Sequence, residues 1–338
     1  MLYRTLLRPM LFRIDPERAH ELALKSATML ARAPLLARGI QAVFARPKLN
    51  PVTTLGLTFP HPIGLAGGMD KNGVAPLAWW VFGFGFVELG TVTPRPQVGN
   101  DKPRMFRFPK DRAIVNRMGF NNGGAEALAN RLAEQARRGQ RPPFPIGISV
   151  GKNKDTPAEQ AVEDFVLAAQ IVTPQADFLT INVSSPNTPG LRAMQNAADV
   201  AGLVKAVCDV SFGKPVLVKV APELTGVDLQ AVLDAALAAG AAGIIATNTL
   251  STANRPDLPQ GGLSGLPLRE LSLARVAEIR KHLGDKPTLV GCGGIADAPS
   301  AQAMLDAGAN LVQLYSALVY EGPFLPARIS RGLNRRGK

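Results

Sequence analysis

The sequence predicts an α/β protein, a (β/α)8 barrel of the TIM type with a small N-terminal helical extension. Short apolar or β-branched runs recur eight times along the chain, as buried strands do. A segment with helical periodicity follows nearly every run, and parallel strands need such crossover connections. The eight units span about 275 residues, close to the ~250 residues usual for a closed barrel. An open doubly wound sheet is the alternative arrangement of the same units.

The elements follow one another in the order that a barrel requires. The expected strands are Ile63–Ala66, Phe86–Val92, Ile146–Val150, Phe178–Val183, Val216–Val220, Gly243–Thr247, Thr288–Gly291 and Leu311–Tyr315. The expected helices between them include Glu126–Arg138, Ala158–Ile171, Val200–Val210, Asp228–Ala239, Leu268–Leu283 and Ser300–Ala307. Residues 93–125 and 248–267 do not fit the repeat, and insertions of this length in a compact domain tend to be functional lids.

The first fifty residues precede the barrel. Asp15 and Pro16 form an N-cap and first-turn pair that starts one helix. The apolar residues that indicate a second short helix are Leu36, Ile40, Val43 and Phe44. The apolar faces of these helices either pack on the barrel surface or open toward lipid. We therefore expect two parts, a helical extension over residues 1–50 and a barrel domain over residues 51–338.

The formal net charge of +12 is concentrated at the two ends of the chain. Residues 1–50 hold nine Lys or Arg against three acids, and residues 328–338 hold five and no acid. No nucleic-acid reading motif accompanies them, so nucleic acid is not an expected partner. Because the N-terminal charges are interleaved with apolar residues, an anionic membrane surface fits better. Nothing resembles a cleaved signal peptide, and no apolar run reaches the ~18 residues of a membrane span.

Polar residues and glycines gather just past the C-terminal ends of the predicted strands, where barrel enzymes place their active sites. They include Gly67, Gly68, Met69, Asp70, Lys71, Thr91, Gly151, Lys152, Asn153, Asn182, Asn187, Lys219, Thr247, Asn248, Thr249, Gly293, Gly294, Tyr315 and Ser316. A barrel with only a structural role would not need such residues at all eight strand ends. The pattern therefore predicts an enzyme. The three histidines are too scattered for a metal site, and we expect no metal.

Lys219 lies inside an apolar strand, where a side chain pointing outward would meet helices at a high cost. It should therefore point into the barrel mouth. There it could act as a Schiff-base nucleophile or remain charged beside a reduced flavin ring. The strand ends at Gly293-Gly294 and Tyr315-Ser316 match the place where barrels commonly bind phosphate, although a glycine pair can equally be a tight turn.

Four asparagines, Asn116, Asn182, Asn187 and Asn248, fall at strand ends or in the first insertion. Each side-chain amide offers donors and an acceptor, so several in one pocket suit a planar ligand edged with C=O and N–H groups. Turn and cap chemistry explains most single asparagines, but four in this arrangement favour a binding site. No strand end supplies an obvious histidine or carboxylate base. Ser184 or Ser185 remains as the available proton acceptor.

Several long motifs occur along the chain: Asp15–His20, Leu65–Gly73, Gly90–Gln97, Asn116–Asn121, Gly151–Lys154, Asn182–Gly190, Thr247–Thr249, Gly261–Gly265, Gly291–Ile295 and Leu311–Ser316. Together they resemble those of the class 2 dihydroorotate dehydrogenases. The resemblance covers about residues 12–328. It implies oxidation of dihydroorotate to orotate in pyrimidine biosynthesis, with electrons passing to a membrane quinone.

The resemblance further implies that FMN lies across the barrel mouth. Its phosphate would contact Gly265, Gly294, Tyr315 and Ser316, and its ring would lie near Gly67, Gly68, Met69, Asp70, Lys71, Thr91, Ser149, Asn182, Lys219 and Thr247. Dihydroorotate would be held by Lys71, Asn116, Arg117, Met118, Gly119, Phe120, Asn182, Asn187, Asn248 and Thr249. Ser185 matches the catalytic base of the family.

The resemblance also concerns the N-terminal extension. His20 and Arg107 match positions that line the quinone tunnel of the family. It implies a monomer that is bound peripherally to the cytoplasmic face of a bacterial inner membrane. Ser149 departs from the family pattern, which usually has an asparagine in contact with the flavin at this position. Affinity for the flavin, or its potential, could therefore differ.

Three other functions compete with this interpretation. A soluble class 1 enzyme uses a cysteine base, so Ser185 and the basic N-terminal helices speak against it. A Schiff-base aldolase on Lys219 would show no flavin absorbance. A membrane-bound barrel without activity would be consistent only with the change at Ser149, since the other motifs are intact.

Overall fold

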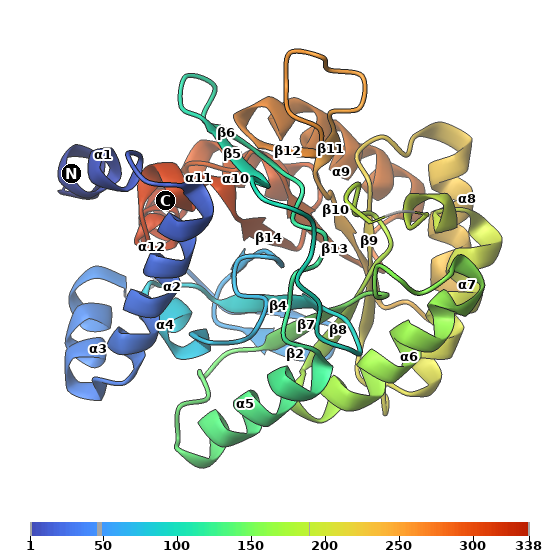
Figure 1. Ribbon diagram of the computed structural model, residues 1–338, viewed down its shortest axis with the longest axis horizontal. Helices are drawn as coiled ribbons and strands as arrows, with labels where there is room; N and C mark the ends of the chain where they lie inside the picture. The colour runs from blue at the N-terminus through green and yellow to red at the C-terminus, as the bar shows by residue number, and fades with distance from the viewer. Residues whose placement is uncertain (1, 46–48, 189, 337–338) are drawn as a thin grey trace.

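The computed structural model describes residues 2–45, 49–188 and 190–336. Eight parallel strands close into a barrel in the order β10-β13-β14-β3-β4-β7-β8-β9 (Figure 1). In chain order they are β3 (Ile63–Leu65), β4 (Phe86–Val92), β7 (Ile146–Val150), β8 (Phe178–Asn182), β9 (Val216–Val220), β10 (Gly243–Ala246), β13 (Thr288–Cys292) and β14 (Leu311–Leu314). The predicted barrel is confirmed, with strand ends at most one residue from those expected. The open-sheet alternative is excluded, because β3 pairs with both β4 and β14.

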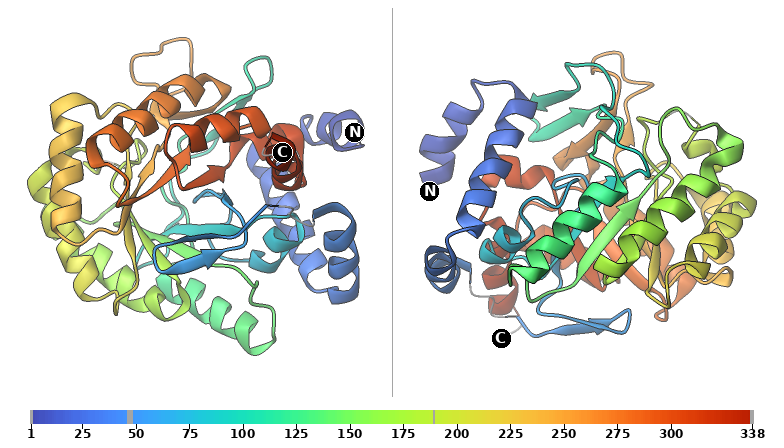
Figure 2. Two further views of the ribbon diagram at one scale, coloured as in Figure 1. Left: turned by 180° about the vertical axis from the view of Figure 1, so that it is seen from behind. Right: turned by 60° about the horizontal axis from the view of Figure 1, so that its bottom comes forward.

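Helices surround the barrel on its outer face (Figure 2). They are α4 (Pro76–Val81), α5 (Ala125–Arg137), α6 (Ala161–Val172), α7 (Ala197–Asp209), α8 (Gly226–Ala238), α9 (Arg269–Leu283), α10 (Ala298–Asp306), α11 (Ser316–Glu321) and α12 (Leu325–Arg336). The six predicted helices correspond to α5–α10. We did not predict α4, α11 or α12. The first two are six residues long and mostly buried, so neither shows the apolar stripe of a surface helix.

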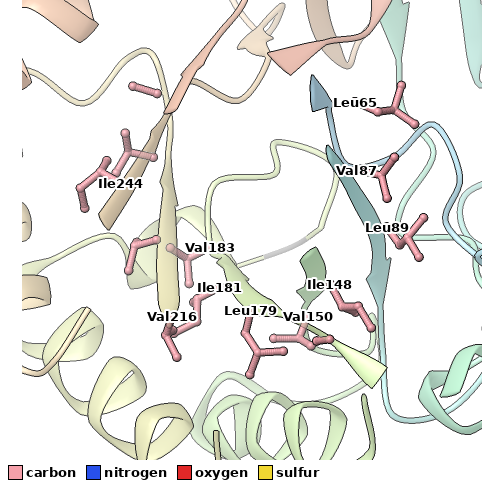
Figure 3. Close-up of a cluster of buried hydrophobic side chains, with 14 of the residues drawn as sticks. Leu65, Val87, Leu89, Ile148, Val150, Leu179, Ile181, Val183, Val216 and Ile244 are labelled. Carbon is pink, nitrogen blue, oxygen red and sulfur yellow. The ribbon is translucent and has the colours of Figure 1, made fainter. Parts of the chain in front are cut away.

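Apolar side chains fill the space on both sides of the barrel wall. Outside it, alternate strand residues such as Leu65, Val87 and Leu179 pack against the helices (Figure 3). Inside it, a second cluster plugs the end at which the strands begin; its buried members are Phe59, Ala66, Phe86, Phe178, Leu217, Ile245, Val290, Cys292 and Leu311. The rings of Phe59 and Phe86 pack edge to face, with their centroids 5.3 Å apart. The interior is therefore closed below the pocket.

A short hairpin carries Phe59 into this plug. Its strands are β1 (Val52–Thr54) and β2 (Leu57–Phe59), which pair antiparallel. Gly64 makes room for the plug, because a Cβ atom there would lie 2.2 Å from the Phe86 ring.

The two insertions form a small antiparallel sheet, where we had expected loops. Its strands are β5 (Met105–Phe108), β6 (Ala113–Asn116), β11 (Leu250–Ser251) and β12 (Gly262–Gly265), in the order β11-β12-β6-β5. The β6–β12 pairing joins the two insertions, with Gly262 opposite Asn116. Strands of two to four residues carry too little periodicity to be recognised, and pairing partners so far apart cannot be read from a local pattern.

The N-terminal extension consists of a π-helical turn η1 (Tyr3–Leu7), α1 (Arg8–Leu11), α2 (Pro16–Ala31), α3 (Pro34–Ile40) and a second π-helical turn η2 (Gln41–Ala45). The two predicted helices are confirmed as α2 and α3. The Asp15 side chain caps α2 by accepting the Arg18 backbone N–H at 2.9 Å. No described helix is both long and apolar enough to cross a bilayer. Residues 46–48, the Phe44 side chain and Pro189 of the Asn182–Gly190 motif lie outside the described structure.

Candidate active site

A pocket opens at the C-terminal ends of the barrel strands, beneath the small sheet. It encloses about 1130 Å³, its open mouth included. The predicted site residues that line it are Gly67, Gly68, Lys71, Thr91, Asn116, Met118, Gly119, Phe120, Asn182, Ser185, Asn187, Lys219, Thr247, Asn248, Thr249, Gly265, Gly294, Tyr315 and Ser316. The chain order places these residues far apart. The barrel brings them to one cavity because its strands are parallel and end on the same face.

Lys219 lies at the bottom of this pocket and is buried. Its Nζ is 3.6 Å from Glu88 Oε1, and Gln313 Nε2 donates to Glu88 Oε2 at 2.7 Å. Burial by itself lowers the pKa of Lys219, but the attraction of Glu88 outweighs it and the net pKa is raised. The amine is therefore an ammonium at neutral pH, which argues against a Schiff-base nucleophile, since that role needs the neutral amine.

Glu88 and Gln313 were not among the predicted site residues. Each is a polar residue inside an apolar strand, as Lys219 is. A polar side chain that pointed outward from such a strand would meet the helices at a high cost, as argued for Lys219. The same reasoning predicts from the sequence that Glu88 and Gln313 point into the barrel.

Hydrogen bonds connect the predicted asparagines. Asn182 Nδ2 donates to Thr91 Oγ1 at 2.7 Å, and Asn248 Nδ2 donates to Asn182 Oδ1 at 3.1 Å. Asn187 Nδ2 donates to Asn116 Oδ1 at 3.3 Å. These contacts fix the amide planes along the pocket wall. The remaining polar atoms suit a flat ligand with alternating donors and acceptors.

Ser184 and Ser185 face different surroundings. The Ser184 hydroxyl is fully buried; it donates to Asn182 Oδ1 at 3.2 Å and accepts from Asn248 Nδ2 at 2.9 Å. Ser185 lines the pocket, and among the described residues its Oγ accepts a single, long bond, 3.3 Å, from the Asn187 backbone N–H. Of the two serines, Ser185 has the hydroxyl that a ligand can reach.

Lys71 lines the other side of the pocket, next to the segment Met118–Phe120. Its Nζ donates to Asn121 Oδ1 at 2.8 Å. Burial, followed by the positive charge of Arg104, lowers the pKa of Lys71 to about 8. The amine is thus an ammonium at neutral pH and loses its charge in mildly alkaline solution.

A narrow end of the pocket is lined by glycines and hydroxyl groups. Gly294 has a φ of +68°, and a Cβ atom there would lie 2.3 Å from Arg269 Cα, so only glycine fits. Ser316 Oγ donates to Ser264 Oγ at 2.8 Å. Arg112 also lines this end and pairs with Glu321. Sequence reasoning missed Ser264 and Arg112, which lie in or beside the unexpected sheet.

Four residues predicted to bind the flavin or the substrate do not line the pocket. Asp70 accepts the backbone N–H groups of Val74 and Ala75 at 2.8 and 2.9 Å, so its carboxylate serves the start of α4. The Met69 side chain packs in the core outside the barrel. Ser149 lies behind Thr91, with 2.8 Å between the two hydroxyls. Arg117 turns outward and donates to the Pro103 carbonyl through Nη2 at 2.9 Å.

His20 and Arg107, the predicted quinone-tunnel residues, lie on α2 of the N-terminal extension and on β5 of the small sheet. Arg107 on β5 donates to the Leu11 carbonyl at 3.0 Å and stacks over the Phe12 ring at 4.5 Å. His20 on α2 is half-buried. Burial, followed by the charge of Lys71, lowers the pKa of His20 to about 4, so its imidazole is neutral. This interaction places the histidine near the pocket wall that carries Lys71.

Comparison with known proteins identifies the family. Residues 50–336 match the family model of dihydroorotate dehydrogenase. The chain is 45% identical to the dihydroorotate dehydrogenase (quinone) of Novosphingobium aromaticivorans, covering 98% of this chain and 94% of the relative. It is also 45% identical to the protein of that name from Deinococcus deserti, covering 99% and 95%.

Solved structures agree with the sequence relatives. A crystal structure of DHODH from Eimeria tenella in complex with ferulenol superposes with a TM-score of 0.82, at 34% sequence identity. The match covers 96% of this chain and 93% of that one. The chain therefore belongs to the dihydroorotate dehydrogenase family, in its quinone-dependent class.

Proposed function

We propose that the pocket oxidises dihydroorotate to orotate and that a quinone finally accepts the two electrons, a step of pyrimidine biosynthesis. One observation carries the proposal. In a chain 45% identical to quinone-dependent relatives, the barrel brings Lys71, Ser185, a set of linked asparagines and a buried Lys219 to a single cavity. The raised pKa of Lys219 supports this function over a Schiff-base aldolase.

Members of this family are flavin-dependent, and FMN is the flavin that we propose here. The pocket residues fit it. Gly265, Gly294, Tyr315 and Ser316 would hold the phosphate at the narrow end. At the other end, the buried Gln313 Oε1 has no hydrogen-bond partner among the described residues, as expected of an acceptor that awaits a ligand donor. When bound, FMN supplies a hydride acceptor.

The remaining side chains bind the substrate and move a proton. In this proposal the Lys71 ammonium pairs with the carboxylate of dihydroorotate, and the asparagines and Thr249 bind the amide edges of its ring. Oxidation removes a hydride from C6 and a proton from C5, and a C5–C6 double bond forms. Ser185 takes the proton and must pass its own onward, because a serine alkoxide is far too basic to persist at neutral pH.

We propose that residues 1–50 form the membrane and quinone-binding part and residues 51–338 the catalytic part. The extension exposes large apolar side chains at Leu2, Leu6, Leu7, Met10, Leu22, Met29, Leu35, Leu36 and Val43. Such a surface beside basic residues suits peripheral binding to an anionic bilayer. A quinone would enter from the bilayer past His20 and Arg107. We further propose a monomer on the cytoplasmic face of a bacterial inner membrane.

A visible spectrum of the purified protein tests the cofactor, and two anaerobic additions test the reaction. We expect flavin absorbance, bleaching by dihydroorotate, and return of the absorbance when a quinone is added. Absence of flavin together with borohydride trapping of a substrate on Lys219 would instead establish aldolase chemistry. Return of the absorbance with fumarate or NAD but not with a quinone would indicate a class 1 activity.

A further inference from the structure

Three buried polar residues form the floor of the pocket. Glu88 on β4, Lys219 on β9 and Gln313 on β14 are 0%, 5% and 1% exposed. Two residues before each of them, Phe86, Leu217 and Leu311 belong to the apolar plug inside the barrel. Because side chains alternate along a strand, residues two apart point to the same side. The three polar groups therefore lie directly above the plug, on the inner side of the barrel wall.

Glu88 is the member of this set that contacts both others. One carboxylate oxygen, Oε2, accepts from Gln313 Nε2 at 2.7 Å, while Oε1 lies 3.6 Å from Lys219 Nζ. Oε1 has no hydrogen-bond partner among the described residues. A Cβ atom on Gly67 would lie only 2.4 Å from Oε1, so a glycine is needed where the carboxylate approaches the pocket wall.

We propose that Glu88 is a positioning residue of the active site, whose carboxylate fixes the Lys219 ammonium at the pocket floor and turns the Gln313 amide so that its oxygen faces the ligand. This inference rests on the function proposed above. Glu88 does not line the cavity itself, whereas Lys219 and Gln313 both do. It acts through these two side chains.

The charge of Lys219 depends on this contact. The titratable groups that interact with it are Glu88 from β4 and Cys292 from β13, and burial opposes the charge of Lys219 itself and of the Cys292 thiol. Without Glu88, burial is the largest remaining influence on the amine, and its pKa falls. Lys219 would then lose its proton in the neutral to alkaline range instead of remaining an ammonium throughout.

The same contact determines which end of the Gln313 amide is free. Because the NH₂ group donates to Glu88, the Oε1 atom is left as a buried acceptor without a partner. A ligand N–H group can bind to this oxygen without any change in the orientation of the Gln313 side chain. In a Glu88→Gln variant the new amide offers both a donor and an acceptor, so the orientation of Gln313 is no longer fixed.

The test compares Glu88→Gln with Glu88→Asp and with a matched control, Thr180→Val. Thr180 follows Phe178 by two residues, so it belongs to the same interior layer; it is fully buried, and its hydroxyl has no partner among the described residues. The midpoint potential of the bound flavin is measured against pH by anaerobic spectroelectrochemistry. The melting temperature of the flavin-free protein is measured over the same range.

We expect the pH dependence of the potential in Glu88→Gln to show one ionisation that the wild type lacks, with the potential falling below that of the wild type as Lys219 loses its proton. Glu88→Asp, which keeps the charge, should restore the wild-type profile, and Thr180→Val should not alter it. In the flavin-free protein, Glu88→Gln should be least stable at every pH below the lowered pKa of Lys219 and should recover as pH rises through it, because the unfolded chain then binds more protons than the folded one.

Parallel pH profiles for wild type and Glu88→Gln would overturn the inference and leave Glu88 a structural residue only. If Glu88→Gln does not fold, the double variant Glu88→Gln/Lys219→Met decides. Recovery of folding would identify the unpaired ammonium as the fault and support the inference, while continued failure would oppose it. A wild-type protein that binds no flavin, or whose flavin dihydroorotate does not bleach, would instead refute the proposed function, whatever the variants show.

Discussion

Ser184 and Ser185 are neighbours in the chain, but their hydroxyl groups have different tasks in the structure. Ser184 is held by Asn182 and Asn248 and stiffens the pocket wall. Ser185 lines the cavity, and the described part of the chain gives its hydroxyl one long hydrogen bond. A group that must exchange a proton with a ligand has to be reachable and only weakly engaged. Single substitutions of these two serines therefore test the proposed chemistry most directly.

Replacing Ser185 with alanine should slow flavin reduction by dihydroorotate by roughly 10²–10⁴-fold, the usual cost of losing a positioned general base. Substrate affinity should change much less, because Asn182, Asn187 and Lys71 remain. Ser185→Cys should recover part of the rate, since a thiol ionises more readily. Stopped-flow bleaching under anaerobic conditions measures all of these rates, with Ser184→Ala as the matched control. A crippled Ser184→Ala beside a nearly normal Ser185→Ala would reverse the assignment.

The ionisation of Lys71 should make substrate binding weaker as the pH rises. Its pKa of about 8, lowered first by burial and then by Arg104, means that the ammonium is present below that value and lost above it. Affinity for the substrate carboxylate should therefore fall as pH rises through about 8, approaching a tenfold loss per pH unit. Titration of the oxidised enzyme with orotate measures this. Lys71→Met should bind weakly at every pH, and an unchanged profile in that variant would remove Lys71 from substrate binding.

At the scale of elements, the N-terminal extension is fixed to the barrel by buried ion pairs. Arg104, in the first insertion, donates through Nη2 to Glu17 on α2 at 2.7 Å, and both side chains are 8% exposed. Arg4 and Arg112 both pair with the buried carboxylate of Glu321 on α11. Since Arg112 also lines the pocket, the extension and the pocket share one hydrogen-bonded frame.

Glu17→Gln should loosen α2, because it leaves the buried Arg104 guanidinium without its counterion, and such a loss is strongly destabilising. Burial raises the pKa of Glu17, but the hydrogen bond and charge of Arg104 outweigh it and lower the net pKa. The stabilisation is therefore present above the unfolded value and is lost as pH falls through the folded one. Limited proteolysis should cut residues 16–31 faster in Glu17→Gln. The exposed Glu21→Gln on the same helix is the control and should not differ from wild type.

At the scale of the whole molecule, basic and apolar groups collect at one side. The C-terminal helix α12 lies beside the N-terminal extension, where it contacts η2, so the two basic ends of the chain are neighbours (Figure 1). Within the extension, α3 presents Leu35 and Leu36, which are 84% and 58% exposed. The barrel body carries almost no net charge, so any attraction to an anionic surface acts on this side.

The double variant Leu35→Asp/Leu36→Asp should weaken binding to anionic vesicles and slow electron transfer to long-tailed quinones, while leaving flavin reduction by dihydroorotate unchanged. Wild-type binding should weaken with added salt, since each basic residue near the surface contributes about 1 kcal/mol that salt screens. Vesicle cosedimentation and quinone turnover measure these effects. Val227→Asp, equally exposed on α8, is the control. Equal losses in both variants would exclude α3 as the membrane contact.

Much of the site could be predicted because all strands of a barrel end on the same face, so a residue that follows any strand lies at that face. Once strands such as β8 and β10 were recognised by their apolar runs, Asn182 and Asn248 had to lie at the same end of the barrel. The direction of a side chain was harder to predict. Asp70 stands among predicted pocket residues, yet its carboxylate turns away to the start of α4. The partners of this carboxylate are the backbone N–H groups of Val74 and Ala75. Such backbone partners cannot be recognised from the pattern of side chains in the sequence.

The sequence by itself determined the eight barrel strands, the capped helix at Asp15 and the family, because each depends on patterns within short segments or on long motifs. Only the tertiary structure decided the small sheet over the pocket, whose central strands β6 and β12 are nearly 150 residues apart. It also decided that Glu88 reaches Lys219 across the barrel interior. Both are long-range pairings, and their geometry follows from closure of the barrel rather than from any local periodicity.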